Sequence, residues 1–481
     1  MSPKQKKILL VSGCVVALLI FVITALVLFI NVNVYKPRIE AAASDAIGMD
    51  FKIGGAMRIV LFPRFGVSLE NVLIKKGETD FLSAQRVRIG LKLLPLIKHE
   101  ARISEFTIIK PKIIIERDKN GRFNFEGPMQ KPAKEEKLPV ALLTMGSFVI
   151  SKGELVFLDR TSDVRTELND IDLNIKDLSF TAERSHSLLQ DISFSGNFQC
   201  ESLKAKDFEV KNIKFDMKGK DGIFDISPIA MNFFGGTEKG NLKADLTGDS
   251  PFLKIQFAST KFDFEKFVEA FSRRKIMEGQ MDFSLNIVTK GKSLEEMKRR
   301  MNGEASLKGE NLLLYGLDLD SLLSKIEQSQ SFSLVDVGAF FLAGPLGTML
   351  TKGYDFAGVY KETKGGQGII KELVSEWRIK NGIAEAEDVA LSTKRNRLAM
   401  KGGLDFVNSQ FDDVTVAALD ENGCAKFSQK IHGPFQNPKI EKISTLKTIV
   451  GPAVKLFEKA QKFIGLRKCK VFYKGSVKHP V

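Results

Sequence analysis

Residue types that commonly carry out catalysis are sparse and scattered in this chain of 481 residues. The sequence contains no Gly-x-Ser-x-Gly elbow, no Gly-x-x-x-x-Gly-Lys-Ser/Thr phosphate loop and no His-Glu-x-x-His pair. Its histidines have no cysteine, aspartate or second histidine at metal-ligand spacing, so each is expected to be solvated or structural. They are His99, His186, His432 and His479. The sequence therefore predicts no catalytic residue, no metal site and no cofactor, and the protein is not expected to be an enzyme.

The strongest single signal is an uncharged apolar run over residues 8–30. As a helix it would span roughly 35 Å, enough to cross a hydrocarbon core of ~30 Å. Three lysines lie within residues 1–7, whereas only Lys36 and Arg38 follow the run closely. The positive-inside rule then places residues 1–7 in the cytoplasm and the rest of the chain on the other side. The alternative is a cleaved signal peptide, but the run is longer than the usual apolar core of ~7–15 residues, and residues 31–35 offer no small-residue cleavage site.

The four cysteines allow at most one disulfide outside the membrane. Cys14 lies inside the apolar run, which leaves Cys200, Cys424 and Cys469 for the far compartment. If that compartment is oxidising, one pair can bond and one thiol remains, and Cys424 with Cys469 is the candidate pair. The alternative is that these cysteines stay reduced and act as small buried hydrophobes.

The net charge indicates that the protein works near an anionic membrane surface, and the aromatic content indicates apolar surfaces shielded from water. Lys and Arg number 72 against 58 Asp and Glu, a net charge of +14 that is spread along the chain. This distribution fits an anionic membrane surface better than a single nucleic-acid footprint. The 37 Phe beside one Trp and five Tyr are rings without a polar group. No nucleic-acid partner is expected, because the predicted anchor places this surface outside the cytoplasm.

Most of the chain after residue 51 alternates apolar and polar residues with a period of two, which predicts strands with one dry and one wet face. The clearest examples are residues 86–93, 171–176, 213–218 and 281–288. Gly-containing pairs predict the turns between strands. They are Asn120-Gly121, Lys152-Gly153, Asp221-Gly222, Gly235-Gly236, Asn302-Gly303, Asn381-Gly382 and Gly402-Gly403. The body is therefore predicted to be a long succession of antiparallel strands.

Predicted helices are too few to cover so many one-sided strands, which leaves sheet-on-sheet packing or a groove. They are residues 37–47, 262–274, 294–301, 317–328, 335–350 and 444–464. A charged stretch with prolines, residues 130–138, predicts a linker. The predicted organisation is an N-terminal β unit at 31–129, the linker, a β body with short helices at 139–440, and a C-terminal helix and tail at 441–481.

Apolar residues on the alternating strands are candidates for the lining of such a groove. Each could equally belong to an ordinary closed core. The candidates are Ile89, Leu91, Ile171, Leu173, Ile213, Phe215, Phe283 and Leu285.

Residues 34–124 resemble the N-terminal region of the AsmA family, bacterial proteins of the cell envelope that are anchored in the inner membrane. The resemblance rests on an ordered set of short motifs, none of which is specific alone. They are 35–40 (YKPRIE), 48–55 (GMDFKIGG), 61–67 (LFPRFGV), 71–72 (NV), 81–87 (FLSAQRV), 93–96 (LLPL), 110–113 (KPKI) and 118–124 (DKNGRFN). The C-terminal part is similar to the family's tail region at 377–382 (WRIKNG), 398–402 (LAMKG), 433–434 (GP) and 437–438 (NP). Residues 180–300 match only in their strand pattern, and Asp50-Phe51 replaces the small polar residues more common there.

The resemblance implies an elongated, twisted antiparallel sheet that is curled lengthwise into a groove. Relatives are related to bridge-like lipid-transfer proteins and are implicated in moving phospholipid between the inner and outer membranes. The expected protein is thus single-pass in the inner membrane, with its body in the periplasm and with phospholipid as its partner. The alternative is an assembly factor for outer-membrane proteins that binds polypeptide by strand addition. The remaining alternatives are an enzyme without a recognisable catalytic motif and a plain scaffold.

Overall fold

The protein is described by a computed structural model that divides into two compact units, Met1–Lys206 (unit 1) and Asp207–Val481 (unit 2). The described residues are 31–62, 64–93, 95, 102–126, 145–180, 188–205, 208–269, 277–316, 318–326, 366–445 and 469–480. The predicted anchor at 8–30, the linker at 130–138, the helix at 335–350 and all but the start of the helix at 444–464 lie outside these residues. Within the described residues, no helix combines the length and the apolar character needed to cross a bilayer.

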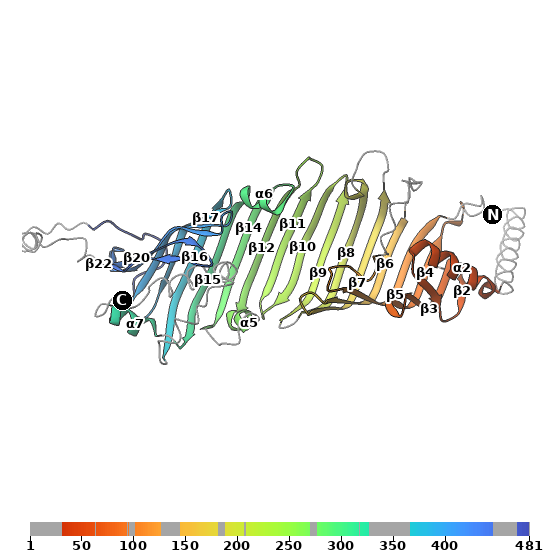
Figure 1. Cartoon of the computed structure of the whole chain (residues 1–481), viewed down its shortest axis with the longest axis horizontal. Helices are drawn as coiled ribbons and strands as arrows, with labels where there is room; N and C mark the ends of the chain where they lie inside the picture. Colours follow the sequence, from red (N-terminus) through yellow and green to blue (C-terminus); the bar gives the residue numbers. More distant parts are fainter. Residues whose placement is uncertain are drawn as a thin grey trace, which may run out of the picture. The chain divides into compact units, whose positions relative to one another are not determined.

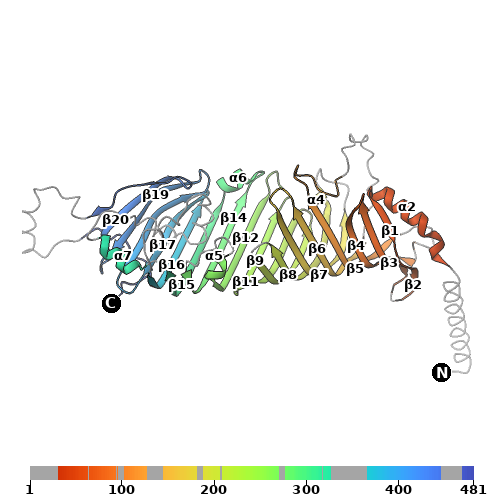
Figure 2. The ribbon, with the colours of Figure 1, turned by 60° about the horizontal axis from the view of Figure 1, so that its bottom comes forward.

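The described part of unit 1 begins with a short 3-10 turn, η1 (Val32–Tyr35), which is followed by the helix α2 (Lys36–Ile47). The predicted helix at 37–47 is confirmed, with Pro37 in its first turn and Gly48 in the left-handed conformation at its end (φ 67°). The backbone N–H of Ile53 donates to Glu40 Oε1 over 2.7 Å. This bond ties α2 to the first strand, β1 (Asp50–Ile53), which lies beside it (Figure 2).

The sheet of unit 1 follows chain order from β3 to β8, and β1 and β2 both pair with β3. All pairs are antiparallel except β5 with β6, which is parallel, so the expectation of a purely antiparallel sheet is wrong at this one pair. A parallel pair needs a long crossover, and the residues between β5 and β6, which include the predicted linker, are numerous enough for one. The further strands are β2 (Met57–Val60), β3 (Gly66–Lys76), β4 (Thr79–Leu91), β5 (Ile103–Arg117), β6 (Met145–Asp159), β7 (Val164–Phe180) and β8 (Ile192–Ala205), with α4 (Leu188–Asp191) before β8.

Unit 2 is an antiparallel sheet in which consecutive long strands are neighbours, as Figure 1 shows from β9 to β17. Short strands β21 and β22 pair with β20, and β13 pairs with β15. The strands are β9 (Phe208–Lys220), β10 (Ile223–Phe233), β11 (Thr237–Asp245), β12 (Phe252–Asp263), β13 (Met277–Glu278), β14 (Gln280–Lys290), β15 (Asn302–Tyr315), β16 (Gln367–Lys380), β17 (Ile383–Ser392), β18 (Arg397–Asp405), β19 (Gln410–Leu419), β20 (Ala425–Pro434), β21 (Lys439–Ile440) and β22 (Ser444–Thr445).

The described helices of unit 2 correspond to the predictions at 262–274, 294–301 and 317–328, and are α5 (Phe264–Glu269), α6 (Leu294–Arg299) and α7 (Leu319–Ile326). Helix α6 ends two residues earlier than predicted, whereas residues 270–274 and 327–328 lie outside the described residues. The helix predicted to begin at Ser444 does not begin there, because Ser444 and Thr445 form β22 and pair with β20. Cross-strand hydrogen bonding overrides local helix preference at this position.

Some of the predicted turns are β-bulges. Asp221-Gly222, Gly235-Gly236 and Asn381-Gly382 are turns as predicted. Lys152-Gly153 and Gly402-Gly403 instead lie inside β6 and β18 at register shifts. The prediction is wrong at these two pairs because a bulge and a turn both use a residue with positive φ, so the local signal is the same. Asn302-Gly303 likewise starts β15 rather than forming a turn.

Bulge-like residues recur in the middle of many strands. In unit 1 a non-glycine residue adopts positive φ on each of β3, β5, β6 and β7, and in unit 2 on β9, β12, β15 and β19. Such a residue bends its strand and increases the local right-handed twist. They include Asn71, Lys110, Lys152, Asp170, Asn212, Lys261, Asn311 and Asp413. The sheets of both units are therefore bent along the strands.

The closed cores lie in different parts of the two units. In unit 1 the core gathers on β1–β5 around Leu69, Val72 and Val87. In unit 2 the main core runs over β12–β20 with α5 and α7, and its member Trp377 is only 2% exposed. Strands β6–β8 and β9–β11 contribute few fully buried apolar side chains.

Candidate apolar binding face

Strand register in unit 1 brings apolar residues into unbroken rows that cross the sheet on one face. Residues paired directly across neighbouring strands share a face. The first row passes from β3 to β8 through Leu69, Val87, Ile108, Ile150, Leu173 and Phe198. The second row runs beside it through Val67, Ile89, Phe106, Phe148 and Ile175. We call this surface the apolar face of unit 1.

Burial changes along these rows. Val87 is 6% exposed and Ile108 is 9% exposed, so this end of the first row is closed core. Ile150, Leu173 and Phe198 are half-buried. In the second row the rings of Phe106 and Phe148 stack with centroids 5.9 Å apart, yet both remain half-buried. The first row is therefore closed over β3–β5 and partly accessible over β6–β8, whereas the second row is half-buried along its whole length.

Unit 2 also has rows of apolar residues across its sheet, but here burial increases toward the C-terminal strands. One row passes from β9 to β16 through Phe215, Ile229, Gly240, Phe257, Leu285, Ala305 and Trp377. A parallel row contains Met217, Ile226, Leu242, Ile255 and Ile287, all half-buried. The first row begins half-buried at Phe215 and ends buried at Trp377. These rows define the apolar face of unit 2.

The eight predicted groove residues all lie on these two faces and are all half-buried. Those on β4 and β7 belong to unit 1, and those on β9 and β14 belong to unit 2. Other strands separate the two strands within each unit, so neither unit brings its predicted residues together in one compact site. Ile89 packs against the core of unit 1, and Phe283 and Leu285 against the core of unit 2. The structure adds row members that were not singled out from the sequence, among them Phe148, Phe198 and Phe257. The same alternation was present around them, but only the register shows that they continue the rows.

One carboxyl group interrupts the apolar face of unit 2. Glu238 on β11 pairs across to Met231 and Ser259 and is 1% exposed. Its Oε1 accepts a hydrogen bond of 2.8 Å from the Ser259 hydroxyl, while its Oε2 is buried without a hydrogen-bond partner. Burial raises the pKa of this carboxyl, although hydrogen bonds from Ser259 and the Phe233 backbone oppose the rise.

Phenylalanine rings from β9, β10, β12 and α5 gather in one cluster. We call this set the Phe cluster. Phe233 packs edge-on against Phe208 at 5.8 Å, and Phe234 against Phe267 at 5.6 Å. Its members are Phe208, Phe233, Phe234, Phe262, Phe264 and Phe267. Phe208 is 36% exposed, whereas Phe262 and Phe264 are buried, so the cluster grades from core to surface.

A cavity of about 840 Å³ crosses the middle strands of unit 2. Apolar row members Ile229, Phe257 and Leu285 contribute to its wall, and so do polar neighbours such as Gln256 and Glu304. Its volume lies in the range of sites for small organic ligands. The mixed lining suits a molecule with both apolar and polar parts.

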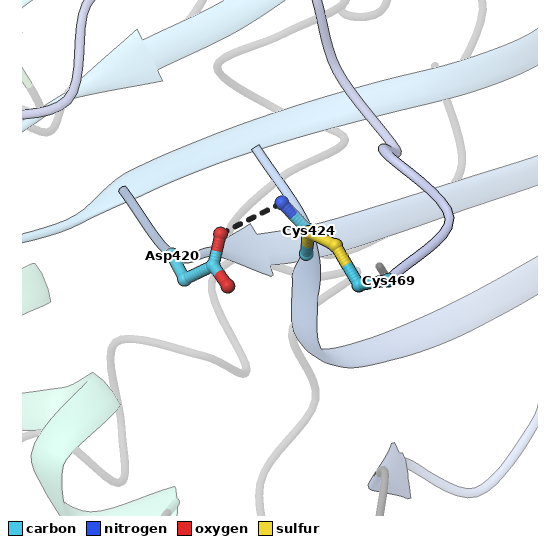
Figure 3. Close-up of side chains that lie close together, drawn as sticks. All are labelled: Asp420, Cys424 and Cys469. Carbon is cyan, nitrogen blue, oxygen red and sulfur yellow. Dashed lines mark hydrogen bonds between the residues drawn. A yellow bond between two sulfur atoms is a disulfide. The ribbon is translucent and has the colours of Figure 1, made fainter. Parts of the chain in front are cut away.

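The cysteine pair predicted from the sequence is brought together. Cys424 and Cys469 form a disulfide with Cα atoms 6.1 Å apart, a normal spacing, while Cys200 is a buried free thiol. Figure 3 shows Asp420 beside them, with Oδ1 accepting the Cys424 backbone N–H over 2.8 Å. These three residues form the one group with metal-ligand spacing among the described residues. Both sulfurs are bonded to each other in the disulfide, so this group is a cross-link next to a turn that Asp420 stabilises.

Comparison with known proteins gives one positive finding. No curated protein and no solved structure matched the chain. The sequence model of the AsmA family matches residues 2–177 and 182–343, which is most of the chain. With its long, bent β-sheets and rows of apolar residues, this chain belongs to the AsmA family.

Proposed function

We propose that this protein binds phospholipid on its apolar faces and takes part in phospholipid transport between the inner and outer membranes, which supports the integrity of the envelope. The observation that carries the proposal is the set of unbroken apolar rows that stay half-buried over β6–β8 and β9–β12. A soluble domain normally closes such rows with another layer. An acyl chain that lies on the rows would complete this burial.

The energy and the dimensions are adequate for a lipid chain. Each methylene removed from water contributes about 0.8 kcal/mol, so ten methylenes on the face contribute about 8 kcal/mol before the entropy of binding is subtracted. Neighbouring strands are about 4.8 Å apart, so the six-strand row of unit 1 spans roughly 24 Å. One leaflet of a bilayer is about 15 Å of hydrocarbon. A single acyl chain therefore fits across the row.

The proposed location is the inner membrane, with residues 8–30 as the anchor and the body in the periplasm. The charge asymmetry around residues 8–30 supports the orientation. The Cys424–Cys469 disulfide supports an oxidising compartment for the body, because cytosolic thiols are normally kept reduced.

One edge of each sheet favours lipid over polypeptide as the ligand. Strand addition needs a long, accessible edge. The edge beside β3 is occupied by four-residue β1 and β2, which carry exposed Asp50, Lys52 and Arg58. The edge beside β20 is occupied by two-residue β21 and β22. Short, charged edge strands are a common protection against pairing with another chain, so the assembly-factor role is the weaker proposal.

Site-specific photocrosslinking in cells tests the proposal directly. A photoreactive phenylalanine analogue at Leu173 or Phe215 is expected to capture phospholipid, detected by mass spectrometry of the purified full-length protein. The matched controls are Asp172 and Asp216, the next residues on the same strands, which face the other side and are exposed. Equal capture at both faces, no lipid adduct, or polypeptide adducts at Leu173 would each contradict the lipid role.

A further inference from the structure

The last long strands of unit 2 are apolar on both faces, unlike the strands before them. Consecutive residues are fully buried on β17, β18 and β19, for example Val389, Ala390 and Leu391. Leu391 belongs to the main core, but Ala390 belongs to a separate cluster on the other side of the sheet. We call it the second-face cluster. Its sheet members are Val374, Ala390, Ala399, Ala417 and Leu419.

The second-face cluster is covered by the end of the chain, residues 469–480, which we call the C-terminal strap. Tyr473 and Val477 of the strap are 7% and 0% exposed, and both belong to the cluster. Ala390, Ala399 and Ala417 beneath them are each 0% exposed. The strap therefore removes an apolar surface of β16–β19 from water.

Polar contacts hold the middle of the strap to β17. The Tyr473 hydroxyl donates to Asp388 Oδ1, and the Ser476 backbone N–H donates to Asp388 Oδ2 over 2.9 Å. The Val477 N–H donates to the Tyr473 hydroxyl oxygen over 3.0 Å. The single carboxylate of Asp388 thus accepts hydrogen bonds from two residues of the strap.

Arg397 on β18 connects the strap to the turn before Cys424. This side chain is largely buried, with Nη1 donating to the Val477 carbonyl over 3.1 Å and Nη2 to the Asp420 carbonyl over 3.0 Å. Its guanidinium lies 5.5 Å from the centre of the Tyr473 ring. Arg397 therefore binds both the strap and the turn that precedes Cys424.

The strap has little regular structure of its own. Its single β-bridge joins Val471 to Cys424, and the N–H groups of Phe472 and Tyr473 both donate to the Gly423 carbonyl. The disulfide joins it covalently at the same place, across a sequence separation of 45 residues. In the chain-entropy treatment, a cross-link over such a loop shifts the ratio of attached to free strap by on the order of a thousandfold.

We propose that the C-terminal strap is an oxidation-dependent cover for the second face of β16–β19. The Cys424 and Cys469 thiols together lose two protons and two electrons as their S–S bond forms, and a protein disulfide of the thiol–disulfide exchange class accepts them and becomes a dithiol. Reduction by a dithiol reverses this step. The strap is then held by non-covalent contacts alone, and its release exposes the apolar second-face cluster. This inference does not depend on lipid binding.

Hydrogen exchange of the full-length protein, followed by mass spectrometry, tests the cover. Reduction with dithiothreitol is expected to increase exchange in the strap and in peptides from β17 and β18, by up to on the order of a thousandfold, with no change in unit 1. The Cys424→Ser/Cys469→Ser variant should show this state without reductant. Cys200→Ser is the matched control, because that thiol is free and lies in unit 1; it should respond to dithiothreitol as the wild type does.

Unchanged exchange of the strap after reduction would overturn the proposal, once alkylation has shown that both cysteines are reduced. If the double serine variant fails to fold, reduction of the folded wild-type protein still decides the question. Faster exchange spread evenly over unit 2 would also contradict the proposal, because it would indicate a general stabilising cross-link and not a cover.

Discussion

The Ser259 hydroxyl donates to one oxygen of the Glu238 carboxyl over 2.8 Å, while the other oxygen of this carboxyl is buried in the apolar face of unit 2 without a partner. A buried carboxylate with an unpaired oxygen is destabilising, and the protonated form is favoured instead. This pair therefore makes the stability of unit 2 depend on pH.

Glu238→Gln is expected to stabilise the protein at neutral and alkaline pH. Burial raises the pKa of the Glu238 carboxyl above its ordinary value of 4.5, so between these two pKa values the folded state holds a proton that the unfolded state has lost. The free energy of unfolding then falls as the pH rises from about 4.5 through the raised pKa. The variant should lose this fall and unfold at a higher temperature than the wild type at pH 8.

Thermal unfolding at pH 4.5 and pH 8 measures this difference. Glu421→Gln, in an exposed turn of the same unit, is the matched control and should leave the wild-type profile unchanged. If the wild type instead gains stability relative to Glu238→Gln between pH 4.5 and pH 8, the carboxyl is ionised and paired in the folded protein, and the prediction is wrong.

Two substitutions in one row separate an accessible face from a closed core. Leu173→Asp, at a half-buried position, is expected to abolish co-purification of phospholipid with the full-length protein and to lower Tm by only a few degrees. Val87→Asp, three strands away along the same row and 6% exposed, should cost several kcal/mol and lower Tm by more than about 10 °C. Equal unfolding of both variants would show that the row is closed along its whole length.

The bulge at Gly402 is expected to require glycine. Its φ is +109°, and a Cβ there would lie 2.6 Å from the Asp413 carbonyl oxygen and from the Val414 Cα. Gly402→Ala should therefore destabilise unit 2 by about 1–3 kcal/mol. The fluorescence of Trp377, the single tryptophan and buried in this unit, reports the change. Gly248→Ala, where a Cβ meets nothing within 4 Å, should be neutral, and an equal loss in both variants would argue against strain at the bulge.

The orientation of the chain is testable with protease. If residues 8–30 anchor the protein with residues 1–7 in the cytoplasm, protease added to intact spheroplasts should degrade the body. A tag at the N-terminus should stay protected until the membrane is broken. A body that survives in intact spheroplasts would reverse the proposed orientation.

The sequence alone determined the local elements of this protein. Alternation with a period of two identified the strands around Leu173 and Phe283, and Pro37 with Gly48 delimited α2, because these signals act within a few residues. The ordered motifs of residues 34–124 led to the family. The cysteine count allowed at most one disulfide outside residues 8–30 and made Cys424 with Cys469 a candidate, but it left open whether these cysteines bond or stay reduced.

Only the tertiary structure decided which residues became neighbours and how far each was buried. The parallel pairing of β5 with β6 and the bulge at Lys152 depend on partner strands distant in sequence, and a positive φ is the same local signal in a bulge and in a turn. Glu238 lies on a strand that alternates polar and apolar residues and has a charged side chain, yet on β11, between β10 and β12, it is only 1% exposed. Burial is set by the layers that meet a face, and that information is not contained in any single strand.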